Sequence, residues 1–253
     1  MKKIFNFLLL TFIIFSTSFA KDNSLKDIQN KKEIVIGLDD TFAPMGFRDE
    51  QGKIIGFDID LANEVAERMG VKATFKPCEW DGIIFDLRSK KIDLIWNGLT
   101  ITPQREKQIL FSTPYFDDDQ IVIVKDPSIK SFEDLKGKNI GVQLGSASYF
   151  AFENSSLAKK TDKVNKYSTN VEALLDLEAG RTDAVVIDAV IGKYYTSKKG
   201  GFIILNEVLD KQQMGVGIRK QDLALKNEID KTLANMKADG SFNKIYQKWF
   251  GNN

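Results

Sequence analysis

Residues 86–96 read Asp-Leu-Arg-Ser-Lys-Lys-Ile-Asp-Leu-Ile-Trp, and residues 176–186 read Asp-Leu-Glu-Ala-Gly-Arg-Thr-Asp-Ala-Val-Val. Both stretches have the pattern of a helix end, a short turn and a buried strand. The repeat predicts two small α/β lobes of similar design. Five residues after the second aspartate of each copy come Gly98 and Asp188. Both should lie just beyond the carboxyl end of a core strand, which is where open α/β sheets bind ligands.

Strand-like and helix-like segments alternate around each copy of the repeat. This order predicts parallel sheets with helices on their faces. The expected elements are strands at 33–37, 71–75 and 92–96 with helices at 58–69 and 80–88, then strands at 138–143 and 184–187 with helices at 146–152 and 171–178, and finally a strand at 216–219 and helices at 222–237 and 242–250.

The chain is expected to pass between the lobes twice. The acidic run 117–119, before the apolar run 121–124, is the predicted first link, and the chain returns near 212–217. One lobe would then hold residues 21–117 and 217–253, and the other residues 118–216.

The first twenty residues have the pattern of a cleaved secretory signal. Lys2 and Lys3 precede an apolar run at 4–15, and Ser18-Phe19-Ala20 is a small-x-small cleavage site. A short membrane anchor is the alternative, but this run is too short for a hydrocarbon core of roughly 30 Å. The mature protein, residues 21–253, is therefore expected in the periplasm.

Composition excludes several classes of function. The chain has 36 basic and 35 acidic residues, and without the two lysines of the leader the acids outnumber the bases by one. It therefore lacks the basic excess of a nucleic-acid-binding protein. The absence of histidine excludes a Ser-His-Asp triad, a Cys-His dyad and an HExxH zinc site. The paired carboxylates have no EF-hand spacing, so neither a metal nor a cofactor is expected.

Arg105 is the first candidate ligand-binding residue. Thr102 followed by Pro103 has the pattern of a helix start, which puts Arg105 at the third helical position. A cation there opposes the helix dipole, and a ligand carboxylate held by the guanidinium fork would explain it. The alternative is a surface arginine paired with Glu106 or Asp118.

Four further residues have both a functional and a structural interpretation. Asp188 would bind an ammonium group or cap the helix that begins at 189. Ser146, after Gly145, would offer backbone N–H groups to an anion or form a plain capping turn. Phe42 and Trp80 follow strand ends and would flank a ligand side chain or belong to the core.

These residues lie within strings that resemble a known family. The chain resembles the periplasmic polar amino-acid-binding proteins of ATP-binding-cassette importers, the bacterial extracellular solute-binding protein family 3. The strings are Gly37-Leu38-Asp39-Asp40-Thr41-Phe42-Ala43-Pro44, Gly56-Phe57-Asp58-Ile59-Asp60-Leu61, Asp93-Leu94-Ile95-Trp96-Asn97-Gly98-Leu99-Thr100-Ile101-Thr102-x-x-Arg105, Phe111-Ser112-Thr113-Pro114-Tyr115, Gly141-Val142-Gln143-x-Gly145-Ser146, Ala184-Val185-Val186-x-Asp188 and the closing segment 240–251.

The resemblance implies a fold and a site. The implied fold is α/β, with two lobes, each a sheet flanked by helices, joined by two hinge strands and closing on the ligand. Arg105 would hold the ligand α-carboxylate and Asp188 its α-ammonium, while Asp39 reads the end of the side chain. The implied site residues are Asp39, Phe42, Trp80, Asn97, Gly98, Thr100, Arg105, Gln143, Ser146, Ala147 and Asp188.

The expected function is capture of a polar amino acid without chemistry, and its delivery to an ABC permease by a monomer. Acids near the pocket mouth favour a basic ligand, namely lysine, arginine or ornithine. Glutamine or cystine remains open as the ligand, and so does docking to a membrane receptor. A periplasmic dehydratase acting on cyclohexadienyl substrates is the enzymatic alternative on the same fold.

Overall fold

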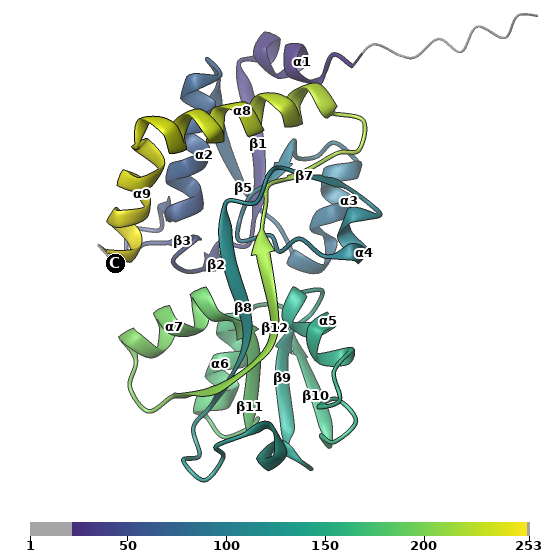
Figure 1. Cartoon of the computed structure of the whole chain (residues 1–253), viewed down its shortest axis with the longest axis vertical. Helices are drawn as coiled ribbons and strands as arrows, with labels where there is room; N and C mark the ends of the chain where they lie inside the picture. Colours follow the sequence, from purple (N-terminus) through teal and green to yellow (C-terminus); the bar gives the residue numbers. More distant parts are fainter. Residues whose placement is uncertain (1–21, 252–253) are drawn as a thin grey trace, which may run out of the picture.

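The computed structural model describes residues 22–251, so the predicted signal at 1–20 lies outside the described residues. The chain forms two α/β lobes stacked along its long axis, and both ends of the described chain lie in one lobe (Figure 1). The expected two-lobed fold is confirmed. Within residues 22–251, no helix has the length and apolar character needed to cross a bilayer.

The first lobe is built on a five-stranded sheet in the order β5-β1-β6-β13-β7. A small sheet, β2-β3-β4, extends from it. The strands are β1 (Glu33–Leu38), β2 (Thr41–Phe42), β3 (Gly46–Arg48), β4 (Ile54–Ile55), β5 (Lys72–Pro77), β6 (Leu94–Ile95), β7 (Leu110–Phe111) and β13 (Gly217–Ile218). The helices are α1 (Ser24–Lys31), α2 (Phe57–Arg68), the 3₁₀ turn η1 (Trp80–Gly82), α3 (Ile83–Arg88), α4 (Pro103–Glu106), α8 (Leu223–Asp239) and α9 (Ser241–Phe250).

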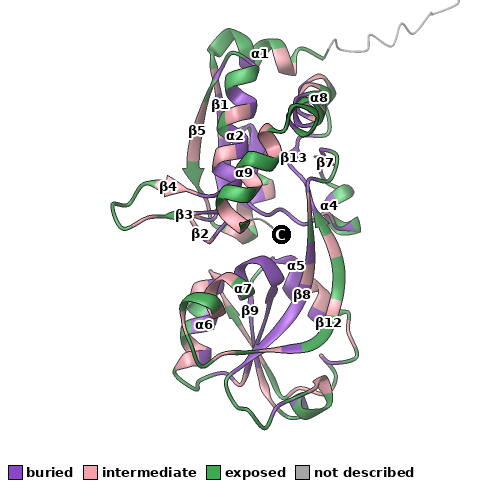
Figure 2. Ribbon diagram, turned by 60° about the vertical axis from the view of Figure 1, so that its left-hand side comes forward, coloured by how far each residue is buried: buried purple, intermediate pink, exposed green. Residues whose placement is uncertain are grey.

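The second lobe has a five-stranded sheet in the order β10-β9-β11-β8-β12. Its strands are β8 (Phe116–Val124), β9 (Asn139–Gln143), β10 (Lys163–Tyr167), β11 (Ala184–Asp188) and β12 (Ile203–Met214). Its helices are the 3₁₀ turn η2 (Phe132–Leu135), α5 (Ala147–Glu153), α6 (Asn170–Glu178) and α7 (Ala189–Lys198). The inner strands of this sheet are buried and the helices expose their outer faces (Figure 2).

The expected parallel pairing holds for only part of each sheet. β5, β1 and β6 run parallel, as do β10, β9 and β11, but β13, β7, β8 and β12 pair antiparallel. The reason is that β8 carries the chain into the second lobe and β12 carries it back, so neighbouring strands run in opposite directions. The two strands lie side by side between the lobes (Figure 1).

The acidic run 117–119, the predicted first link between the lobes, is part of the strand β8. It pairs with residues 211–213 of β12, where Gln213 Nε2 donates to Asp117 Oδ1 at 2.7 Å. Polar partners on β12 therefore let consecutive aspartates join a strand. The long β12 itself was not predicted, because only Leu205 and Met214 of this strand are buried and no alternating apolar face marks it.

The sequence repeat corresponds to a repeated set of hydrogen bonds. Asp93 Oδ2 accepts from the Val35 N–H at 2.9 Å, and Asp183 Oδ2 accepts from the Asn139 N–H at 2.8 Å. Each aspartate therefore fixes the start of the neighbouring parallel strand, and with it the place where both strands end. Asp93 also pairs with the buried Arg219, at 3.4 Å from its Nη2.

This difference between the copies predicts unequal effects on stability. Asp93→Ala leaves the buried Arg219 with fewer partners and should lower the free energy of unfolding by about 3 kcal/mol. Asp183→Ala removes only a hydrogen-bond acceptor and should cost about 1–2 kcal/mol. Urea denaturation of the two variants measures both values, and equal losses would contradict the assignment.

Candidate functional site

The predicted site residues gather between the lobes. Those of the first lobe follow β1, β5 and β6, and those of the second lie at the ends of β9 and β11 or just after them. All except Trp80, which is half-buried, are buried. The members are Asp39, Phe42, Trp80, Asn97, Gly98, Thr100 and Arg105 from the first lobe, and Gln143, Ser146, Ala147 and Asp188 from the second.

The two lobes are in direct contact at this site. Gln143 Nε2 donates to Asp39 Oδ2 at 2.8 Å, and Arg105 Nη2 donates to the Gly145 carbonyl at 3.1 Å. A Cβ on Gly145 would lie 2.9 Å from the Asp81 Cα, so the backbones approach closely where φ is +72°. The structure is therefore a closed form.

Arg105 is buried, not a surface arginine. Thr102 caps α4 as expected, since its Oγ1 accepts from the Arg105 N–H at 3.3 Å. The guanidinium donates to the carbonyls of Thr100, at 2.8 Å, and Gly145, and forms no ion pair with any carboxylate of residues 22–251. Its five N–H donors exceed these two bonds, so it retains donors for an anion. The alternative pairing with Glu106 or Asp118 is wrong.

Arg105 and Asp188 belong to opposite lobes and lie close enough for their charges to interact. Burial lowers the pKa of Arg105 to about 10, and the negative charge of Asp188 acts in the opposite direction. The guanidinium therefore stays charged at neutral pH. Trp80 lies beside it, with its ring centroid 5.7 Å from the Arg105 Cζ.

Asp188 stands at the N-cap of α7 but does not cap the helix with its side chain. The Asp118 Oδ1 takes that bond instead, accepting from the Val190 N–H at 3.2 Å. Asp188 Oδ1 accepts from Gln120 Nε2 at 2.8 Å. The capping interpretation of Asp188 is therefore wrong, and its other oxygen accepts no hydrogen bond from the described residues.

Asp39 lies at the other end of the site among neutral donors. It accepts from the Thr41 N–H at 2.9 Å, from the Thr41 hydroxyl at 2.6 Å and from Gln143. Burial raises its pKa above the usual value. Gln143 is itself fixed, since Asn170 Nδ2 donates to its Oε1 at 2.9 Å.

An acidic crevice of about 320 Å³ opens beside Asp39. Its walls carry four carboxylates and no basic side chain. Asp40 is paired with Arg48, and Asp86 with Lys91, whereas Asp39 and Glu79 form no ion pair within the described part of the chain. The crevice therefore has unbalanced negative charge.

The second lobe also offers the start of α5. Ser146 is its N-cap, and its Oγ accepts from the Tyr149 N–H at 3.0 Å. The capping interpretation is therefore confirmed. It leaves the N–H groups at the start of the helix, including that of Ala147, without partners in the helix itself.

Phe42 packs against Gly98, which has φ +57°. A Cβ there would lie 2.6 Å from Phe42 Cε1, so only glycine fits. Asn97 Oδ1 accepts from the Asp39 N–H at 3.1 Å and so links the loops after β1 and β6. These three residues shape the wall of the first lobe.

Asp58 is a positioning residue that the sequence did not reveal. Its Oδ2 accepts from the Gly98 N–H at 2.6 Å and from the Tyr115 hydroxyl at 2.9 Å. In the sequence it is an acid in the first turn of α2, which the helix dipole explains without any contact to the site. Full burial raises its pKa to about 7, against the lowering effects of Gly98 and Tyr115.

Asp58 predicts a pH dependence of stability. The folded form holds a proton up to about pH 7 that the unfolded chain releases near 3.8. Stability should therefore fall as pH rises through this window, by up to about 4 kcal/mol, and level off above it. Asp58→Asn should flatten this part of the profile, measured by denaturation at several pH values. An identical slope in both proteins would contradict this.

The lone Cys78 is half-buried rather than fully buried as a small apolar residue would be. Burial raises the pKa of its thiol, followed by the charge of Asp86. Such a thiol is a poor nucleophile. Within the described residues there is no group of three or more Cys, Asp or Glu side chains that is able to hold a metal ion.

Comparison with known proteins identifies the family. The profile of the bacterial extracellular solute-binding proteins, family 3, matches residues 34–252. The chain belongs to this family. The match covers nearly the whole of this chain, so the expected resemblance is confirmed.

Three similar proteins illustrate the family. The L-cystine-binding protein TcyJ of Escherichia coli K12 is 32% identical over 238 residues, covering 92% of this chain and 88% of TcyJ. An ancestral arginine-binding protein bound to arginine is 45% identical, with a TM-score of 0.82, covering 87% of this chain and 99% of that one. The ancestral amino acid-binding protein AncCDT-1, described as a precursor of cyclohexadienyl dehydratase, is 38% identical, with a TM-score of 0.84, covering 90% and 99%.

Proposed function

We propose that this protein captures a basic L-amino acid in the periplasm and delivers it to an ABC permease. The observation that carries the proposal is the placement of Arg105 and Asp188, two buried opposite charges from two lobes that interact without forming a salt bridge. A zwitterionic backbone supplies both missing partners at once. Buried charges need such partners, since an unpaired one is costly.

The acidic crevice supports a cationic side chain. Asp39 is 5% exposed and has only neutral donors around it, and Glu79 lies on the same crevice. A lysine, arginine or ornithine side chain that runs between Phe42 and Trp80 would bring a positive charge to this end. The similar protein bound to arginine fits this ligand class.

Binding would act by closing the lobes. Only the closed form brings Arg105 and Asp188 to the same ligand, so the ligand stabilises it over an open form. β8 and β12 would serve as the hinge, with residues 21–117 and 217–253 moving against residues 118–216. The predicted leader at 1–20 supports the periplasmic location.

A neutral ligand and an enzyme are the competing functions. TcyJ is named for cystine, which has no net charge, and AncCDT-1 is named as a dehydratase precursor. A dehydratase needs a poised proton donor. Asp39 has a raised pKa, but Thr41 and Gln143 already donate to both its oxygens. We therefore favour binding without chemistry.

Calorimetry of refolded, ligand-stripped mature protein against the common amino acids, ornithine and cystine tests the proposal. We expect one-to-one binding of a basic amino acid, tighter than that of glutamine or cystine. Tightest binding of a neutral amino acid would retain the two-lobed capture but contradict the role of Asp39. Conversion of prephenate or arogenate to an aromatic product would contradict the proposal itself.

A further inference from the structure

The surroundings of Asp188 lack hydrogen-bond donors. One nitrogen, Gln120 Nε2, lies 2.8 Å from Asp188 Oδ1, 3.1 Å from Gln212 Oε1 and 3.3 Å from Asp118 Oδ2. An amide nitrogen carries two hydrogens, so it cannot serve three acceptors at once. The oxygen of the same amide is taken by the Ser148 hydroxyl. The cluster therefore has one acceptor more than this amide can satisfy.

Within residues 22–251, neither carboxylate forms a salt bridge, although Arg105 interacts with Asp188 by charge. Asp118 and Asp188 are 5% and 4% exposed, and neither forms an ion pair with a described lysine or arginine. Burial, followed by the charge of Asp188, raises the pKa of Asp118 well above its usual range. The charged groups around the pair are Asp117 and Asp119 on β8, Lys211 on β12, Lys193 on α7 and Arg105 from the other lobe.

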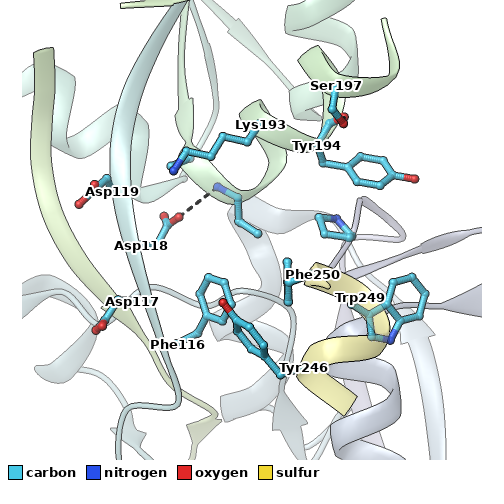
Figure 3. Close-up of a pocket in the computed structure, with 13 residues that line it drawn as sticks. Phe116, Asp117, Asp118, Asp119, Lys193, Tyr194, Ser197, Tyr246, Trp249 and Phe250 are labelled. Carbon is cyan, nitrogen blue, oxygen red and sulfur yellow. Dashed lines mark hydrogen bonds between the residues drawn. The ribbon is translucent and has the colours of Figure 1, made fainter. Parts of the chain in front are cut away.

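Asp118 and Asp188 have different roles at the start of α7. Asp118 holds the Val190 N–H, as the dashed line in Figure 3 marks, and so leaves Asp188 free of the capping bond. Figure 3 also shows Asp118 beside a crevice of about 550 Å³ with aromatic walls from α7 and α9. Asp118 and Asp188 are neighbours, since an oxygen of each lies within 3.3 Å of Gln120 Nε2.

We propose that Asp118 is a second recognition residue for the ligand's ammonium group, and that it holds a proton beside the Asp188 carboxylate until the ammonium displaces it. This rests on the proposed function, because it takes Asp188 as the ammonium partner. Before binding, the pair carries one negative charge. After binding, two negative charges face one ammonium, and one proton has passed to the solvent.

This exchange makes affinity depend on pH. Below the raised pKa of Asp118, a proton on that carboxyl competes with the ammonium, so affinity falls by up to about tenfold for each unit by which the pH is lowered. Above it, both carboxylates are ionised and affinity levels off. The α-ammonium of an amino acid remains protonated throughout this range.

The test is calorimetry with L-arginine and with L-lysine between about pH 5 and pH 8, in buffers of different ionisation enthalpy, which counts the protons released. We expect the natural protein to release a large fraction of one proton at the acid end and to bind more weakly there. Asp118→Asn keeps an oxygen for the Val190 N–H, so α7 stays capped. It should release no proton and bind with an affinity independent of pH.

Asp119→Asn is the matched control, since Asp119 is the next residue of β8 and only half-buried. It should still release a proton on binding, with the pH dependence moved slightly towards acid, because the charge of Asp119 is a minor cause of the raised pKa of Asp118. Binding without proton release by the natural protein would overturn the proposal, and that result needs no variant. An Asp118→Asn protein that is weaker at every pH but releases the same number of protons would show a structural role and also overturn it. Failure of every amino acid to bind would contradict the proposed function instead.

Discussion

Arg105→Ala is expected to weaken amino-acid binding by about 2–5 kcal/mol, which is between tens and thousands of fold in Kd. The variant loses the cation that faces the ligand carboxylate and leaves that carboxylate buried without a partner. It also loses the bond to the Gly145 carbonyl, which joins the lobes in the closed form. Both losses act in the same direction, and calorimetry measures their sum.

One further variant separates the effect of charge from that of geometry, and a second is the control. Arg105→Lys keeps the charge but not the planar fork, so it should recover only part of the affinity. Arg88→Ala is the control, because Arg88 is exposed and lies on the same crevice as Arg105. An Arg105→Ala protein with unchanged affinity would remove Arg105 from the site.

Asp188→Asn is the second large effect, with an expected loss also of about 2–5 kcal/mol in binding. The asparagine is nearly the same size, and Asp188 contributes no capping bond to α7, so folding should be little affected. What disappears is the negative charge opposite the ligand ammonium. The variant should therefore lose affinity while keeping its denaturation midpoint without ligand.

Ligand-free denaturation and calorimetry on the same Asp188→Asn preparation distinguish these outcomes. Equal losses of stability and affinity would indicate a structural aspartate. Retained affinity with a lower stability would contradict the ammonium assignment outright. Asp183→Asn, at the opposite end of β11, is the control for a strand aspartate outside the site.

Local patterns predicted the elements whose residues carry a strong signal. The apolar spacing of α2, the start of α4 at Thr102 and Pro103, and the repeated strands after Asp93 and Asp183 were all visible in the sequence. The antiparallel strands were not, because direction depends on how β8 and β12 pass between lobes. β12 is largely exposed and its apolar residues do not alternate with polar ones, so the sequence has no strand period to detect there.

The site residues likewise fall into those that the sequence revealed and those that it did not. Arg105 could be singled out because a cation at its helical position conflicts with the helix dipole. Asp58, Asp118 and Gln120 could not, because each has an ordinary place in a helix or strand and acts through contacts distant in sequence. Such contacts exist only after both lobes have folded and met.

The most direct test of the central claim deletes the charges of the ligand rather than those of the protein. Calorimetry would compare L-arginine with agmatine, which lacks the carboxylate, with the α-deamino analogue, and with norvaline, which lacks the guanidinium. We predict one-to-one binding of L-arginine, and losses of about 2 kcal/mol or more, some thirtyfold in Kd, for each deletion. Binding of agmatine or the α-deamino analogue as tight as that of arginine would contradict recognition of the amino-acid backbone by Arg105 and Asp188.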